Sequence, residues 1–416
     1  MIIKKKLVLL ESEMQAPNGH FLDYLIESTI YFQDKFNIIW FLNKNCDLKE
    51  SYIPKNVEIN KIIISNYYRR NKNKLFYFFE EIFFFLKNFY DIFYFTVHFI
   101  KKKNFINFLK TLFSNYFIIP RYFKSFYFGV LNSNLNENDH ILVQSCRRKD
   151  ISCIYFFSNI EKIFPKIHLR VFYPPKKRFK SFYFYLSKIE NFMKEKKIFL
   201  YTEHGYKEEL FKNEINNKYL VNTVTPIFSF FERFHTNFTL TIGFVGQARK
   251  DKGFHLLPEL ILKLEKKKIN LNYLIQFTST NKDTEIYKNQ LLSIAKDNSR
   301  VKIINKYLDF KEYRNILSQI DIMPMLYDVK HLTMGNSGVI YSCITHEVSL
   351  VIPNDCSHLK KFLIFKSYEE ARNLDEYVEK IIFMKNNFIL YLSEAKKLSL
   401  DLKNTIKNSS LVRNIV

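Results

Sequence analysis

The stretch from Thr241 to Gly253, TIGFVGQARKDKG, constrains the fold of this chain more than any other part of the sequence. It opens with an apolar run typical of a buried strand, and glycines follow at Gly246 and Gly253. The next segment, FHLLPELILKL, has apolar residues at helical spacing. The sequence therefore predicts a strand, a glycine turn and a helix in succession.

This turn is a candidate site for an anion. A turn of this kind brings backbone N–H groups to the N-terminus of a helix, and Arg249, Lys250 and Lys252 add positive charge beside it. These features predict a site for a phosphate or diphosphate group. An alternative stays open, in which Gly246 only turns the chain and the lysines are solvated surface groups.

Length and charge set limits on the function. With 416 residues the chain is long enough for two domains, each with its own core. Lys and Arg outnumber Asp and Glu by 64 to 41, and this excess favours an anionic partner such as nucleic acid, a membrane face or a phosphorylated substrate. The five cysteines form no CxxC pair, which argues against a zinc site or a disulfide framework and fits a reducing, cytoplasmic setting.

The first half alternates between strand and helix patterns. Apolar runs near residues 7–10, 36–42, 57–64, 140–146, 167–173 and 198–202 are typical of strands. Strands that alternate with helices predict a parallel sheet, and the loops after the strands' carboxyl ends line its ligand crevice. Gly19 and His20, and also Glu203 and His204, follow such ends and are acceptor-side candidates. The alternatives are an exposed loop histidine for His20 and a helix cap and turn for Glu203 and His204.

The segment 75–128 is unusually rich in aromatic residues and lysines. Glu80, Lys87, Asp91 and His98 share one stripe of a helix, and they interrupt the apolar run too often for a membrane-spanning helix. Two interpretations stay open: a helical insertion packed among other elements, or a basic amphipathic surface that binds an anionic membrane face. His98 is a further acceptor-side candidate.

The second half repeats the alternation. Strand patterns occur near residues 270–280, 301–305, 320–326 and 349–353, and Asp309 with Glu312 is typical of a helix N-terminal cap. Tyr327 and Asp328 follow one of these strands, and a second glycine-containing loop then leads through Asn336 to the helical pattern IYSCIT. Two glycine turns in one half, each between a strand and a helix, are predicted to face one diphosphate together.

Three segments carry a resemblance to a known family. FVGQARKDKGFHLLPEL, YLDFKEYRNILSQIDIMPMLYD and SGVIYSCITHEVSLVIP occur in the order and spacing found in the retaining, nucleotide-sugar-dependent glycosyltransferases called group 1 or family 4. The resemblance covers about Leu240 to Pro353. It implies the α/β architecture called GT-B, in which two Rossmann-like domains with parallel sheets flank a central cleft.

The resemblance also implies a division of the chain. Residues 1–233, with the insertion near 75–128, would form the acceptor-side domain, and residues 234–385 would bind the nucleotide sugar. Helices are expected from Tyr368 onward, and those in 386–416 would pack back on the first domain. No cofactor and no obligatory metal are implied.

Roles for individual residues follow from the same resemblance. Gly246 would let the backbone approach the donor diphosphate, and Lys252 would neutralise it. Gln247 stands where the family usually has an arginine, and Arg249 is close enough in sequence to replace it, so that Arg249 and Lys252 are the expected catalytic cations. The residues expected at the donor are Gly246, Gln247, Tyr327, Asp328, Asn336, Ser337, Gly338 and Ser342.

One part of the family pattern is missing. The two glutamates of the family's Glu-x7-Glu pair fall on Met334 and Ser342, and the glycine and proline that usually follow fall on Glu347 and Ser349. A carboxylate accepts hydrogen bonds from both ribose hydroxyls, and a serine replaces only part of that function. The departure puts donor affinity or donor identity in question.

The function implied by the resemblance is transfer of a sugar, with a hexosyltransferase-like activity and retained configuration, from a nucleoside diphosphate sugar to a glycan or lipid-linked acceptor. Surface polysaccharide synthesis at the inner membrane face would suit a cytoplasmic, peripherally attached cationic protein. The main alternative is a catalytically silent GT-B-like scaffold or binding subunit. A nucleic-acid partner is not expected, because no recognition module is visible and the lysines are dispersed.

Overall fold

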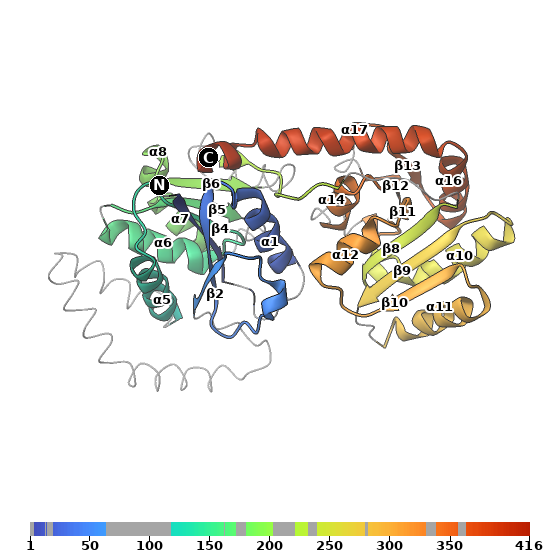
Figure 1. The fold of residues 1–416 in the computed structure, drawn as a ribbon, viewed down its shortest axis with the longest axis horizontal. Helices are drawn as coiled ribbons and strands as arrows, with labels where there is room; N and C mark the ends of the chain where they lie inside the picture. Colours follow the sequence, from blue (N-terminus) through green and yellow to red (C-terminus); the bar gives the residue numbers. More distant parts are fainter. Residues whose placement is uncertain are drawn as a thin grey trace. The chain divides into compact units, whose positions relative to one another are not determined.

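The computed structural model of the chain describes residues 4–12, 14, 20–63, 118–161, 163–171, 180–202, 221–231, 239–278, 282–329, 338–356 and 363–416. The chain divides into two compact units (Figure 1). The first comprises Met1–Ile227 and Ser409–Val416, and the second comprises Phe228–Asn408. Each unit contains one parallel sheet.

The first unit has a seven-stranded sheet in the order β3-β2-β1-β4-β5-β6-β7. Its strands are β1 (Lys5–Glu11), β2 (Phe36–Asn43), β3 (Glu58–Ile63), β4 (His140–Val143), β5 (Lys166–Val171), β6 (Ile198–Thr202) and β7 (Val221–Thr223). Its α-helices are α1 (His20–Phe32), α5 (Ile118–Asn132), α6 (Arg148–Ile160), α7 (Lys180–Lys188), α8 (Glu190–Lys194) and α18 (Ser410–Ile415).

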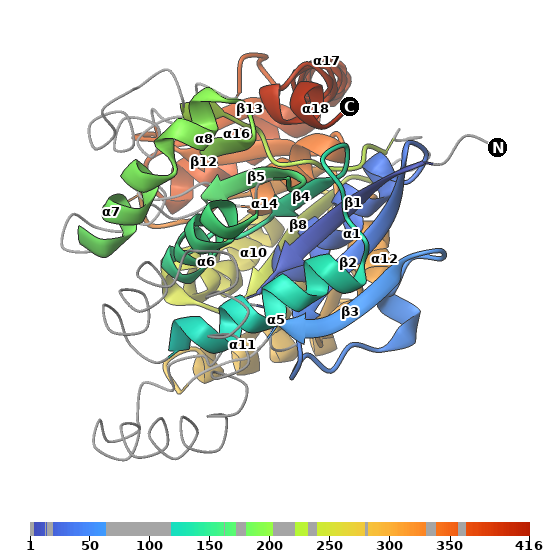
Figure 2. The same cartoon turned by 90° about the vertical axis from the view of Figure 1, so that its left-hand side faces the viewer.

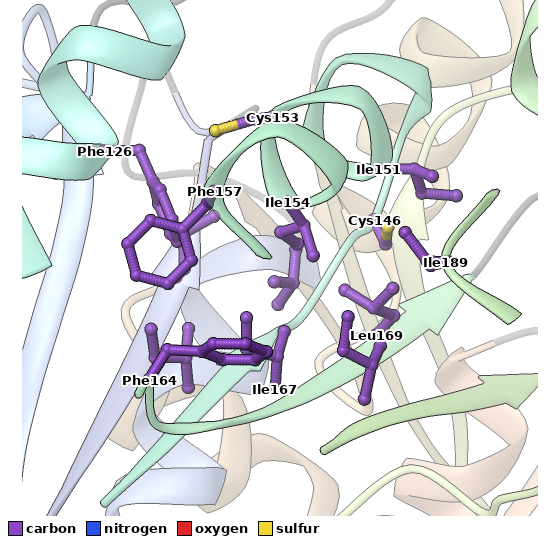
Figure 3. Close-up of a cluster of buried hydrophobic side chains, with 14 of the residues drawn as sticks. Phe126, Cys146, Ile151, Cys153, Ile154, Phe157, Phe164, Ile167, Leu169 and Ile189 are labelled. Atoms are coloured by element: carbon purple, nitrogen blue, oxygen red, sulfur yellow. The ribbon is translucent and has the colours of Figure 1, made fainter. Parts of the chain in front are cut away.

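Alternate residues of these strands face opposite sides of the sheet, as the pleat of a strand requires. One side packs against α5, α6, α7 and α8 and forms an apolar cluster with them. Figure 3 shows part of this cluster, including Phe126 of α5, Phe157 of α6 and Ile167 of β5. Figure 2 looks at the first unit from the side of α5 and α6. On the other side, Trp40 Nε1 in β2 donates a hydrogen bond of 2.8 Å to Thr29 Oγ1 in α1.

The second unit has a six-stranded sheet in the order β10-β9-β8-β11-β12-β13. Its strands are β8 (Thr241–Gln247), β9 (Asn272–Thr278), β10 (Val301–Asn305), β11 (Ile322–Pro324), β12 (Ser349–Pro353) and β13 (Tyr368–Ala371). Its α-helices are α10 (Leu257–Lys266), α11 (Glu285–Asp297), α12 (Phe310–Leu317), α14 (Gly338–Thr345), α16 (Leu374–Asn386) and α17 (Phe388–Lys407).

The predicted α/β fold with parallel sheets is confirmed. The predicted cap of α12 is also confirmed, because Asp309 Oδ1 accepts from the Glu312 N–H at 2.8 Å and Glu312 Oε2 accepts from the Asp309 N–H at 3.0 Å. Two strands were not predicted. β7 is only three residues long, and β13 occupies Tyr368–Ala371, where we expected the closing helices to begin.

The closing helices differ from the expectation in a second way. We expected 386–416 as a whole to pack on the first domain, but α17 belongs to the second unit and only α18 belongs to the first. The reason is that Phe388, Tyr391 and Leu392 of α17 are buried in the core of the second unit. The division between the units falls after Ile227, whereas the sequence placed it after residue 233.

The expected membrane-active insertion lies mostly outside the described residues, which resume at α5. Among the helices that the structure does describe, none combines the length and the apolar composition needed to cross a bilayer.

Candidate functional site

The turn after β8 is built differently from the strand, turn and helix predicted. Two short 3₁₀ helices, η3 (Lys250–Lys252) and η4 (Phe254–Leu256), separate β8 from α10. Their amides are already bonded within the loop: the N–H groups of Lys252, Gly253 and Phe254 donate to the carbonyls of Arg249 or Lys250 at 2.9–3.2 Å. The expectation that these amides point at an anion is therefore wrong for these three residues.

Gly253 fixes the shape of this turn. Its φ is +75°, a left-handed conformation that favours glycine, and a Cβ at this position would lie 2.1 Å from the backbone oxygen of Leu326. Leu326 follows β11, the neighbour of β8 in the sheet. The close approach of two backbones therefore brings η3 against the end of β11, where Tyr327 begins the next loop.

Lys252 lies over Gly246, near the carboxyl end of β8. Gly246 has a φ of +130°, and the position that its Cβ would occupy is 3.8 Å from Lys252 Nζ. The same ammonium lies 6.0 Å from the centroid of the Tyr327 ring. Within the described part of the chain it makes no hydrogen bond and no ion pair. The structure thus brings together three residues that the sequence assigned to the donor site.

The electrostatics of this position favour an incoming anion. Burial lowers the pKa of Lys252, the neighbouring Arg249 guanidinium lowers it further, and Asp251 opposes them. A partly buried ammonium without a bonded counter-charge gains more from an anion than a fully solvated one does.

Gly246 leaves space at this position because it has no side chain, but its amide is not free to bind a ligand. Its N–H donates to Gln276 Oε1 at 3.1 Å, and Gln276 Nε2 donates to the Lys306 carbonyl at 2.8 Å. Gln276 is buried in β9, and its role was not predicted, because a single glutamine in an apolar strand gives no signal.

Arg249 is paired with Asp251, a residue that was not among the predicted site residues. Its Nε donates to Asp251 Oδ1 at 2.8 Å, and its Nη2 is paired with the other carboxylate oxygen. The Asp251 carbonyl accepts from the Asp328 N–H at 3.0 Å, which ties the exposed Asp328 to the turn. Gln247 ends β8 with its side chain exposed.

The second predicted turn is only partly described. Gly338 begins α14, and Ser342 Oγ donates to the Gly338 carbonyl at 3.0 Å. The hydroxyl of Ser342 is therefore bonded inside its own helix. Asn336 and Ser337 lie outside the described residues, as does Met334.

The acceptor-side candidates are largely outside the described residues. Gly19, His98, Glu203 and His204 are among them, and His20 is described only as the first residue of α1.

The first unit instead shows three buried polar side chains at or just beyond the carboxyl ends of adjacent strands. Glu11 ends β1, Gln144 follows β4, and Arg170 lies near the end of β5. Arg170 Nη1 donates to Gln144 Oε1 at 3.4 Å, and its guanidinium stacks 4.3 Å from the Tyr24 ring centroid. Their signal in the sequence is a polar residue inside or directly after an apolar run, as in IHLRVFY.

No protein-family model matches the sequence, and no curated protein matches it. Solved structures do match over almost the whole chain. A glycosyltransferase from Rickettsia africae ESF-5 has a TM-score of 0.58 at 12% identity and covers 99% of this chain and 96% of its own.

Two further solved structures match with similar TM-scores. HepE from Anabaena in complex with UDP has a TM-score of 0.55 at 11% identity, over 96% of this chain and 95% of its own. Sucrose-phosphate synthase from Thermosynechococcus elongatus has a TM-score of 0.54 at 8% identity, over 97% of this chain and 95% of its own. Identities this low establish the fold alone, and that fold is the two-sheet α/β architecture of the GT-B glycosyltransferases.

Proposed function

We propose that this protein transfers a sugar from a nucleoside diphosphate sugar, with retained configuration and hexosyltransferase-like specificity, to a glycan or lipid-linked acceptor. The observation that carries the proposal is the Lys252 ammonium, which lies over Gly246 without a hydrogen-bonded partner among the described residues. The fold supports it, because structures with this fold include HepE from Anabaena in complex with UDP and with UDP-glucose.

The chemistry required of the second unit is charge stabilisation. When the sugar leaves, negative charge develops on the departing nucleoside diphosphate, and a cation already in place lowers the energy of the transition state. Lys252 would supply that charge at the end of β8, with Arg249 adding to the local field through its position beside Lys252. In this proposal no metal ion takes part.

The first unit would hold the acceptor. The buried array of Glu11, Gln144 and Arg170 offers donors and acceptors of the kind that hydroxyl-rich ligands require. The net charge of +23 supports peripheral attachment to an anionic membrane face and hence work on a lipid-linked or surface polysaccharide acceptor.

Calorimetry with UDP and with uridine tests the donor site. Lys252→Met keeps the length of the side chain and removes its charge, so UDP affinity should fall by roughly tenfold to hundredfold while uridine affinity stays unchanged. Lys250→Met is the matched control, because Lys250 carries the same charge in the same turn but is exposed. Equal losses in both variants would show that only the overall charge of the turn matters and would refute the site.

A second function is favoured by Ser342, because its hydroxyl donates to the Gly338 carbonyl inside its own helix and its proton is therefore not free for a ribose. It is that of a catalytically silent GT-B-like scaffold or binding subunit. Product analysis after incubation with a panel of nucleotide sugars and a lipid extract separates the two functions, since the scaffold would yield no glycosylated product.

A further inference from the structure

The face of the first sheet that lies opposite α5 and α6 carries a chain of polar side chains. His140 in β4, His168 in β5 and Tyr201 in β6 are buried, and Asn414 in α18 lies against Tyr201. His140 Nδ1 is 3.0 Å from His168 Nε2, His168 Nδ1 is 3.0 Å from the Tyr201 hydroxyl oxygen, and Asn414 Nδ2 is 3.0 Å from that same oxygen. The four side chains form one continuous hydrogen-bonded relay.

The chemistry of the groups fixes the direction of this relay. The amide nitrogen of Asn414 only donates, so the Tyr201 oxygen accepts from it. The Tyr201 proton then has His168 Nδ1 as its acceptor, and the remaining N–H of His168, on Nε2, donates to His140 Nδ1. In the opposite direction the buried hydroxyl proton of Tyr201 would have no acceptor in the relay, which is costly. The satisfied arrangement requires both imidazoles to be neutral.

The surroundings keep them neutral. The His168 ring stacks on Phe199 with centroids 5.0 Å apart, and His140 contacts the edge of Phe36 at 5.7 Å. The charged groups that act on the pair are Lys5 in β1, Lys166 in β5 and Asp139 before β4. Asp139 itself accepts the Lys6 N–H at 2.7 Å and the Asn136 N–H at 2.9 Å.

Burial and the nearby lysines lower the pKa of both histidines. The pKa of His140 is lowered to about 4, chiefly by burial and also by Lys166 and Lys5, with Asp139 opposing them. Burial lowers the pKa of His168 well below its usual value, and His140 and Lys166 add to the effect.

The relay ends on a short helix. α18 has only six residues, with Leu411, Val412 and Ile415 buried, and the chain passes from the second unit to the first just before it, between Asn408 and Ser409. Besides Asn414, the hydrogen bond of Ser410 Oγ to the Thr223 carbonyl, at 3.2 Å, ties it to the sheet. The Asn414 bond is therefore one of two side-chain hydrogen bonds that tie α18 to the sheet in the described part of the chain.

We propose that the relay makes docking of α18 on the first sheet depend on protons. A proton added to His168 goes to Nδ1, the ring nitrogen without one, and removes the acceptor of the Tyr201 hydroxyl, so that Tyr201 and Asn414 must rearrange and α18 loosens. Both histidines are neutral when α18 is docked, and their pKa is near 6.5 when it is released. Docking is therefore fully favourable above that pH. Docking weakens as the pH falls below about 6.5 toward the lower pKa of the docked state.

Hydrogen exchange followed by mass spectrometry on the full chain tests this proposal. After correction for the intrinsic exchange rate, protection of residues 409–416 should fall by roughly thirtyfold between pH 7.5 and pH 5.0 if one histidine takes up a proton on release. Residues 374–386 of α16, in the second unit, serve as the internal reference and should not show this fall. An identical pH dependence in both segments would overturn the proposal.

Tyr201→Phe is the decisive variant, because it removes the hydroxyl that couples His168 to Asn414 and leaves both histidines in place. Residues 409–416 should then lose their pH dependence. Tyr377→Phe is the matched control, since Tyr377 also has a buried hydroxyl, which donates to the Met325 carbonyl at 2.7 Å in the second unit. If Tyr201→Phe does not fold, Asn414→Leu carries the same expectation. Persistence of the pH dependence in either relay variant would exclude coupling through the relay.

Discussion

The two units differ at the carboxyl ends of their strands. In the first unit, polar side chains at these ends bond to one another, and we call this region the packed edge. In the second unit, a cation without a bonded partner among the described residues lies there, and we call this region the open edge. In the first unit, Arg170 and Gln144 bond to one another, and Arg170 also stacks on Tyr24. In the second unit, Gly246, the next-to-last residue of β8, has no side chain, and the Lys252 ammonium lies beside the space that a side chain would fill. A cation that is already bonded stabilises the fold, whereas one without a bonded partner is available to a ligand.

The largest effect in this comparison is expected at the turn that holds Lys252. Gly253→Ala should destabilise the second unit by about 4 kcal/mol, because a Cβ would meet the Leu326 backbone in a left-handed conformation. Urea unfolding measured by far-ultraviolet circular dichroism should show the loss. Fluorescence of Trp40, the single tryptophan of the sequence, reports on the first unit and should keep its midpoint.

Gly246→Ala is the control for that experiment. Its φ of +130° is also unfavourable for alanine, but the nearest atom to the added carbon is the far end of Lys252 at 3.8 Å. We expect a loss of about 2 kcal/mol in stability. Equal losses for the two variants would show that the backbone conformation, and not the approach to Leu326, sets the cost.

The packed edge of the first unit gives the next largest effect. Arg170→Met removes the donor to Gln144 Oε1 and the stack on Tyr24, and should destabilise the first unit by about 2 kcal/mol. The Trp40 fluorescence midpoint in urea should shift, and UDP affinity measured by calorimetry should not. A large loss of UDP affinity without a stability change would contradict the placement of Arg170 outside the donor site.

Ser342→Glu sharpens the comparison at the open edge. If the ribose lies near α14, a carboxylate there should improve the affinity of both UDP and uridine by about tenfold, or about 1.4 kcal/mol. Ser342→Ala only removes a hydroxyl that is bonded to the Gly338 carbonyl, so it should leave both affinities unchanged. No gain with glutamate would favour the silent scaffold.

The smallest effect is a pH dependence of the open edge. The pKa of Lys252 is lowered by burial and by Arg249, so its ammonium loses its proton at a lower pH than an exposed lysine does. Because the charged form binds the diphosphate, UDP affinity should decline a few-fold as the pH rises above neutrality toward that pKa. Calorimetry at increasing pH should show this decline in the parent protein and not in Lys252→Met.

Local patterns in the sequence determined most of the architecture. Apolar runs separated by helical spacing were enough to predict two parallel sheets, and the Asp309–Glu312 cap was predicted because its two residues are three apart in one helix turn. The strands that were missed, β7 and β13, are short and lie at sheet edges, where few buried positions leave a pattern.

Only the tertiary structure decided which polar groups meet. The sequence places Arg249, Lys250 and Lys252 in one turn, and the fold pairs the first with Asp251, exposes the second and places the third over Gly246. The contact of Gly253 with Leu326 and the relay from His140 to Asn414 join residues that are far apart in the chain. Periodicity reports on which side of its own element a residue lies, but the partner of a buried polar group depends on the register and packing of other elements, which the sequence pattern does not contain.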